Sequence, residues 1–314
     1  MNHDSGAFTM RRLRENLTSS AQVQVLRSRA RPRVHAAAMI LAVLISCVAI
    51  PCRAQNTAEY FYDAAGPRTC TTQAKQPDWA SPLVTSTGRL NNGVRNDTFF
   101  ENGVSGGGSV TDFGGMKGVS YILSDDHGFG IRVGLPSYMV RHGSPEADGF
   151  DDIPVRLKYR LRSQNQCRGN YVLTVFFNAA AAVSRSGAGG GHGSYGPTVA
   201  FGKGWQSFDI QSTLGITLPI GAVDSATGTF VSLNNAFQYN VAKKFWPQVE
   251  VNSTRWLNGK KAGKEQIFLT PGFVYGKVRI SDCLRLTLGA GIQIAAAHYH
   301  AYNHKVILSA RMSL

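Results

Sequence analysis

The chain holds one long apolar run and no second one. Residues 36–50 are unbroken apolar and small residues, and they follow seven arginines between residues 11 and 33. The run is shorter than the roughly 18 residues that a spanning helix needs, and Cys52 and Ala54 stand where a signal peptidase reads small side chains. This pattern predicts a Sec signal peptide over residues 1–54, with Met1 or Met10 as its start. Any later integral membrane contact requires a closed barrel, because open strand edges are not left in lipid.

Cysteine is also scarce. Beyond the signal region only Cys70, Cys167 and Cys283 remain, and three thiols in an oxidising compartment allow one disulfide with one thiol left over. The pairing among the three stays open. No CxxC pattern appears, and the histidines near residue 300 lack acidic or cysteine companions, so neither a metal nor a cofactor is expected.

Acidic residues are few. Residues 1–54 carry eight Lys/Arg and two Asp/Glu, so cleavage lowers the net charge from +14 to +8. A basic balance can indicate nucleic-acid binding, but export and the absence of a basic helix or an aromatic-interleaved patch argue against it. No nucleic-acid partner is expected.

Sequence motifs of catalysis are missing as well. The glycine-rich run at residues 186–194 lacks the Gly-Lys-Ser/Thr ending of a phosphate loop, and no Gly-x-Ser-x-Gly motif is present. We therefore expect a protein that is not an enzyme. A barrel enzyme remains as an alternative, because a Ser–His–acid triad assembles in space; such a cluster near the outer rim would favour it.

Alternating apolar and polar residues dominate the rest of the chain, which indicates strands with one apolar and one polar face. In residues 304–314, Val306, Leu308 and Ala310 share one face, Lys305 and Arg311 the other, and the apolar Ile307 breaks the pattern. Counting back from this strand, about twelve strands are expected at residues 95–101, 117–123, 128–140, 153–161, 171–183, 196–201, 207–218, 229–239, 246–256, 266–280, 284–297 and 304–314.

Short turns and longer loops alternate between these strands. Residues 141–152, 184–195 and 257–265 form the longer connections, which in outer-membrane barrels face the outside. The fold class expected is an all-β, transmembrane antiparallel barrel of about twelve strands over residues 95–314, in the cell outer membrane. Residues 55–94, rich in Pro, Thr and Gln, are expected to be a periplasmic segment.

A soluble β-sandwich or lipocalin-like barrel shows the same alternation with the apolar face inside. Size favours the membrane barrel, since more than ten strands occur in one run without a helical segment to cover a sheet. Trp246 and Trp256, at the two ends of one strand, are expected to belong to aromatic girdles at the membrane interfaces.

Four basic residues alternate with apolar ones along residues 154–162. A charge that faces lipid at mid-bilayer costs about 2–4 kcal/mol, so the basic side chains should point into the lumen. The candidates for lining the lumen by the same rule are Arg132, Arg156, Lys158, Arg160, Arg162, Asp209, Gln211, Glu250, Asn252, Arg285, Lys305 and Arg311. Rings of Arg and Lys favour anions in pores, whereas pairing with the inward acids would instead plug a narrow barrel.

Several stretches resemble a known family. Residues 148–152 (DGFDD) with 155–161 (VRLKYRL), and 246–252 (WPQVEVN), are similar to motifs of the MetA-pathway-of-phenol-degradation-like outer-membrane family. The resemblance covers residues 78–314 and implies a transmembrane barrel with a poorly defined transport role. Asp151 departs from the glycine frequent in that family, and Leu314 replaces the usual terminal aromatic residue.

The function expected is porin-like transport of small solutes, with anionic and aromatic solutes as the candidate classes. A plugged structural or adhesive barrel is the alternative, favoured if arginine–carboxylate pairs or residues 55–95 block the lumen. The expected partners are outer-membrane lipid, a small solute and the barrel-assembly machinery.

Overall fold

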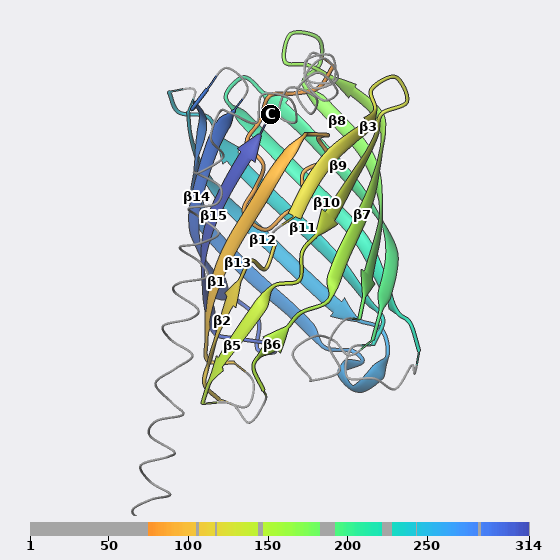
Figure 1. Ribbon diagram of the computed structural model, residues 1–314, viewed down its shortest axis with the longest axis vertical. Helices are drawn as coiled ribbons and strands as arrows, with labels where there is room; N and C mark the ends of the chain where they lie inside the picture. Colours follow the sequence, from red (N-terminus) through yellow and green to blue (C-terminus); the bar gives the residue numbers. More distant parts are fainter. Residues whose placement is uncertain are drawn as a thin grey trace, which may run out of the picture. The chain divides into compact units, whose positions relative to one another are not determined.

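The described residues form one antiparallel sheet that closes on itself. In the computed structural model they are 75–104, 107–116, 118–143, 147–182, 192–221, 228–242, 244–281 and 284–313. The first strand, β1, pairs along its whole length with the last, β15, so the sheet closes into a barrel (Figure 1). No helix in these ranges is both long and apolar enough to cross a membrane.

Fifteen strand segments build the barrel. They are β1 (Gly93–Asn102), β2 (Ser109–Phe113), β3 (Gly118–Ser124), β4 (Phe129–Gly134), β5 (Tyr138–His142), β6 (Gly149–Phe150), β7 (Ile153–Gln164), β8 (Tyr171–Ala181), β9 (Ser194–Trp205), β10 (Phe208–Pro219), β11 (Phe230–Tyr239), β12 (Phe245–Trp256), β13 (Glu265–Arg279), β14 (Arg285–Ala295) and β15 (His304–Ser313). A short 3-10 helix, η1 (Gly259–Lys261), lies in the β12–β13 loop.

Three barrel strands are interrupted. β2 and β3 both pair with β1, β5 pairs with β2 while β4 pairs with β3, and β6 and β7 continue the next strand. The break between β4 and β5 holds Pro136, which has no N–H to give to a neighbouring strand. Joined in this way, the segments make twelve barrel strands, and the expected fold class and strand number are confirmed.

The outer surface of the barrel is apolar. Large exposed side chains include Leu157 on β7, Val199 on β9, Leu214 on β10 and Leu269 on β13, each about half exposed. Exposed aromatic residues gather near the two ends, with Trp205, Tyr239, Phe245 and Tyr275 at one end and Tyr138, Phe150, Phe177 and Tyr195 at the other. An apolar band between two aromatic girdles is the surface that a bilayer requires.

Trp246 and Trp256 do not belong to these girdles, contrary to the expectation. They are only 3% and 8% exposed, because they have the same parity along β12 as the buried Glu250 and therefore face the lumen. Phe245, the neighbour of Trp246, faces outward instead.

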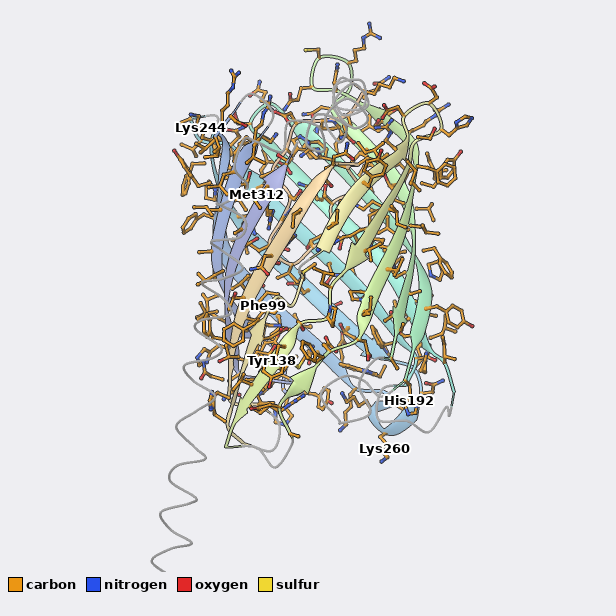
Figure 2. All side chains as sticks on the ribbon, viewed as in Figure 1. Phe99, Tyr138, His192, Lys244, Lys260 and Met312 are labelled. Carbon is orange, nitrogen blue, oxygen red and sulfur yellow. The ribbon has the colours of Figure 1, made fainter. Side chains whose placement is uncertain are left out.

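The two ends of the barrel differ in their connections. Figure 2 shows Lys244 and Met312 at one end, and His192 and Lys260 at the other. The longer connections next to His192 and around Lys260 thus share one end, and the chain finishes at the opposite one. Which end faces outward stays a prediction. The predicted signal peptide, Cys70 and Cys283 lie outside the described residues, while Cys167 is a free, exposed thiol in the β7–β8 turn.

Candidate functional site

The lumen is the candidate site, and most of the polar side chains expected there are on inward faces. Lys158, Asp209, Gln211, Glu250, Asn252 and Arg311 are buried, and Arg132, Arg156, Arg160 and Lys305 are half-buried. Arg285 has the parity of the buried Gln293 on β14, but it lies at the rim and is exposed.

Arg162 is the exception. The sequence alternation places it in the lumen, but a β-bulge at Leu161 pairs Arg160 with Thr174 and Arg162 with Leu173. A bulge adds one residue to a strand and so reverses the faces beyond it. Thr174 is buried inside, whereas Leu173 and Arg162 share the outer face, where Arg162 is exposed close to the strand end.

Residues 75–92, here called the plug, lie inside the lumen and contact inward side chains of the barrel. Residues 55–94 are expected from the sequence to be a periplasmic segment, whereas the structure places residues 75–92 inside the barrel. Residues 55–74 are outside the described ranges. The plug contains neither strand nor helix. Its ends are joined, because the Gln76 side chain donates from Nε2 to Leu90 O at 2.6 Å and accepts at Oε1 from Leu90 N at 3.0 Å.

Arginine and lysine side chains on one side of the lumen bind the plug backbone. We call Arg95 (β1), Arg132 (β4), Arg156 and Lys158 (β7), and Arg311 (β15) the basic wall, since these strands, together with β3 between β4 and β1, follow one another around the barrel. Arg311 donates to Ser81 O and, at 2.8 Å, to Pro82 O. Arg95 donates to Leu83 O and, at 3.3 Å, to Pro82 O.

Two further cations of the basic wall reach the plug beyond Leu83. Lys158 donates from Nζ to Thr87 O at 3.0 Å and to Arg89 O at 3.1 Å, and Arg156 donates to Ser86 Oγ at 2.6 Å. Arg132 instead donates to Met116 O in the β2–β3 connection. The plug thus presents mainly neutral carbonyl oxygens to the basic wall.

Glu250 holds the opposite side of the plug. It is 0% exposed, and its carboxylate accepts hydrogen bonds from three consecutive backbone amides, those of Leu83 (2.7 Å), Val84 (2.9 Å) and Thr85 (2.5 Å). Gln248 Nε2 donates to it at 2.7 Å. A carboxylate with several N–H donors is well stabilised, so β12 clamps the plug from the side away from the basic wall.

Amide side chains complete this second side. Gln211 on β10 donates to Ala80 O at 2.9 Å and to Asp209 at 3.0 Å. Asn252 accepts from Thr270 Oγ1 at 3.2 Å and from Gln293 Nε2 at 3.0 Å. These neutral groups contrast with the basic wall and give the lumen two chemically distinct sides.

Apolar packing anchors the plug between the basic wall and the side of the lumen that carries Glu250. Leu83 is completely buried in a cluster with Phe99, Trp246, Val274 and Ile307 of the barrel and Ala80 of the plug. The barrel makes room through glycines, since a Cβ on Gly272, Gly289 or Gly291 would approach Leu83 within 2.6–2.7 Å. Trp79 sits in the same way against Gly202, where a Cβ would come within 2.5 Å of its ring. The inward apolar residues, such as Ile307, therefore contact the plug.

Asp78 joins the start of the plug to the barrel rim. Its carboxylate forms ion pairs with Arg89 of the plug, at 3.6 Å, and with Lys277 of β13. Burial acts to raise the pKa of Asp78, but Arg89 and Lys277 outweigh it, and the pKa lies below its ordinary value of 3.8.

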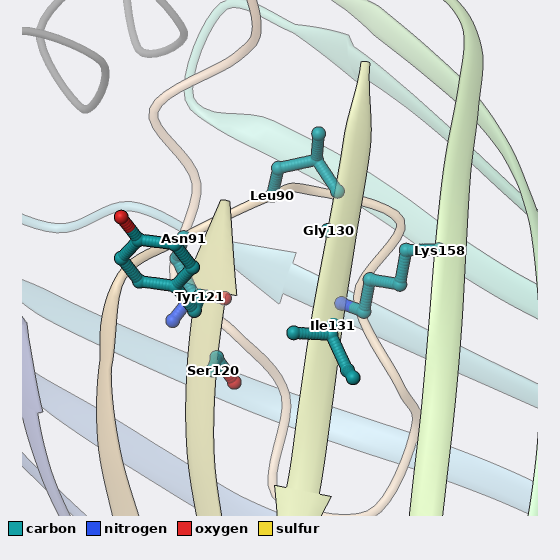
Figure 3. A pocket seen from close by; sticks show the side chains of 7 residues that line it. All are labelled: Leu90, Asn91, Ser120, Tyr121, Gly130, Ile131 and Lys158. Atoms are coloured by element: carbon teal, nitrogen blue, oxygen red, sulfur yellow. The ribbon is translucent and has the colours of Figure 1, made fainter. Parts of the chain in front are cut away.

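One small cavity lies between the plug and the barrel. A cavity of about 10 Å³ lies between Leu90 and Asn91 of the plug, Ser120, Tyr121, Gly130 and Ile131 of the barrel, and Lys158 (Figure 3). This volume is about that of one water-sized probe. The plug and the barrel are therefore in close contact at this point, with room for about one water molecule.

The alternation predicted the inward faces of these strands, and residues 55–95 were expected to block the lumen only under the alternative of a plugged barrel. The alternation did not identify Arg89 or Arg95 as residues of the lumen. The usable signals were Ile307, which breaks the alternation of the last strand, and the glycines on inward faces of β13 and β14.

The barrel resembles solved outer-membrane proteins. A COG4313 outer membrane channel from Pseudomonas putida F1 matches with a TM-score of 0.50 and 10% identity, over 75% of this chain and 100% of that one. Together with the closed twelve-stranded sheet, this likeness defines an outer-membrane-type β-barrel. The NanC porin also matches, with a TM-score of 0.46 and 9% identity over 70% of this chain and 98% of its own.

Neither a family model nor a curated protein matches the chain in sequence. The resemblance to the MetA-pathway family therefore stays a prediction, and the comparison with solved structures concerns the fold.

Proposed function

We propose that this protein is an outer-membrane channel for small anionic solutes. The observation that carries the proposal is the basic wall, which places five Arg and Lys side chains on one side of a twelve-stranded barrel, on β7, β4, β1 and β15. Asp97 is the acid that pairs within this row, at 2.7 Å from Arg95 Nη2. An excess of Arg and Lys along a lumen concentrates anions and repels cations.

Barrel width agrees with this role. Eight strands give an interior that side chains alone can fill, and twelve strands enclose more. Here the additional space is occupied by the plug, so the pathway proposed runs along the basic wall once the plug contacts there are released. The fold shared with an outer membrane channel supports the proposal.

Solute uptake into proteoliposomes tests it. Gluconate and sorbitol are a matched pair, because both are six-carbon polyols and only gluconate carries a charge. We expect gluconate to enter faster than sorbitol, and equal entry or no entry of both would contradict the proposal. Benzenesulfonate, compared with gluconate, then decides whether aromatic anions are preferred.

A plugged structural or adhesive barrel is the second candidate, and the buried contacts of Leu83 and Glu250 with the rest of the lumen favour it. In that case the loops would perform the function. Vesicles would take up neither solute, and shortening the loop at residues 257–264 would reduce attachment of cells to a surface. That the chain is not an enzyme also stays a prediction, to be checked by an ester-hydrolysis assay.

A further inference from the structure

We propose that the plug is a gate, and that anions open the channel by competing with its carbonyl oxygens for the basic wall. This inference rests on the proposed function and names how the same lumen is regulated. The carbonyls of Ser81, Pro82, Leu83, Thr87 and Arg89 occupy the positions on Arg95, Lys158 and Arg311 that an anionic solute would need.

The competition favours a charged ligand. A hydrogen bond from Arg or Lys is charge-assisted with either acceptor, but an oxyanion adds a Coulomb attraction between opposite charges that a neutral carbonyl lacks. A backbone carbonyl is uncharged, so a carboxylate or phosphate that reaches the basic wall offers its cations a better partner. The plug can yield these contacts without breaking a strand, because it contributes none to the sheet.

The connection between the plug and β1 is held in place by the barrel. Asn92 is fixed, since its Oδ1 accepts from Ile122 N at 2.7 Å, and the chain then enters β1 at Gly93. Gly93 has φ +155°, and a Cβ there would come within 2.3 Å of Met312 O. The barrel therefore starts at a fixed point, and a displacement of residues 76–91 would leave the pairing of β1 with β15 intact.

The clamp opposite the basic wall restores the closed state. Glu250 accepts three plug amides and lies on β12, across the barrel from β4. Once anions leave the basic wall, this carboxylate and the apolar site of Leu83 draw the plug back. Closure and opening thus use different sides of the same segment.

A reversible crosslink tests the gate. A Cβ on Gly88 would lie 3.5 Å from the Cβ of Ala200 on β9, within the range for a disulfide, and its other contacts are no closer than 3.4 Å. The full chain with Gly88→Cys and Ala200→Cys is prepared with all five native cysteines (Cys47, Cys52, Cys70, Cys167 and Cys283) replaced by serine. Gel mobility after heating verifies that the barrel is folded, and Gly88→Cys alone serves as the control that cannot crosslink.

Single-channel recording with and without citrate as the anionic probe gives the result. We expect the channel of the reduced double-cysteine variant to open, and citrate to raise its open probability several-fold. The oxidised variant should stay closed with and without citrate. Equal open probability of the oxidised and reduced forms would contradict the proposal that the plug is a gate, but not the proposal of an anion channel. Closure of every form, the single-cysteine control included, would overturn both.

A second variant guards against a crosslink that merely distorts the barrel. Leu83→Ala removes the apolar anchor without touching a charge, and we expect it to open more often than the unaltered protein at the same citrate concentration. A variant with unchanged opening would contradict a gate held by this anchor.

Discussion

Glu250 is the buried side chain that fixes the middle of the plug on β12. It holds the amides of Leu83, Val84 and Thr85 at a place with no exposure to solvent, and its charge is what makes it a good acceptor for all three. Glutamate at this position follows the inward parity of β12, which the sequence predicts. Its partners could not be predicted, because they are more than 160 residues away in the chain.

Replacing this carboxylate should loosen the plug. Glu250→Gln keeps the shape but turns one oxygen into a donor that faces plug amides, and we expect a loss of about 1–3 kcal/mol in stability, the range for buried donors left without an acceptor. Chemical unfolding in detergent micelles measures it. Glu265→Gln, at the exposed start of β13, is the matched control; equal effects of the two substitutions would refute the clamp.

Asp78 should make the rim attachment of the plug depend on pH. Because Arg89 and Lys277 lower its pKa below 3.8, the carboxylate contributes stability above that value and loses it as the pH falls through the lowered pKa. We expect channel opening to increase as the pH is lowered below about 4, and Asp78→Asn to open more at neutral pH and lose this increase. If Asp78→Asn still opened more at low pH, the increase would have to come from the protonation of other groups.

At the scale of elements, strands were predictable and their irregularities were not. Period-2 alternation gave all twelve strands, since each must present one face to lipid. The bulge at Leu161 and the break at Leu135 and Pro136 depend on pairing with β8 and β6. One inserted residue is enough to move Arg162 from the expected lumen to the outer face.

The plug and β14 are matched in shape at one point. A Cβ on Gly289 would lie 2.7 Å from Leu83 Cδ2 and no closer than 3.4 Å to other atoms, so Gly289→Ala should cost about 1–3 kcal/mol by overpacking. Leu83→Ala alone should cost about 2–5 kcal/mol by leaving a cavity. Together they should cost less than the sum, because the methyl of alanine enters the space that leucine leaves.

A double-mutant cycle in unfolding experiments measures this coupling. Gly272→Ala provides the contrast, since its Cβ would also meet the backbone oxygen of Ala290 at 2.7 Å, and Leu83→Ala should not rescue it. Simple additivity of Leu83→Ala and Gly289→Ala would mean that the plug does not occupy this site.

For the whole molecule, the closed sheet and the chemistry of its lining follow from the alternation, but the content of the lumen does not. Residues 75–92 have no periodicity, and their contacts span up to 230 residues. An extended segment rich in Pro, Ser and Thr is typical of a linker as well as of a plug. What distinguishes this one is the barrel, whose inward glycines and apolar residues are complementary to Leu83 and Trp79.

The reversal potential across a planar bilayer, under a tenfold gradient of potassium chloride, tests the central claim most directly. The basic wall predicts a reversal potential of the sign for preferred chloride passage. Its magnitude should be smaller in Arg156→Ala and unchanged in Arg162→Ala, because only Arg156 faces the lumen. A reversal potential near zero, or one of the sign for preferred potassium passage, would contradict the account.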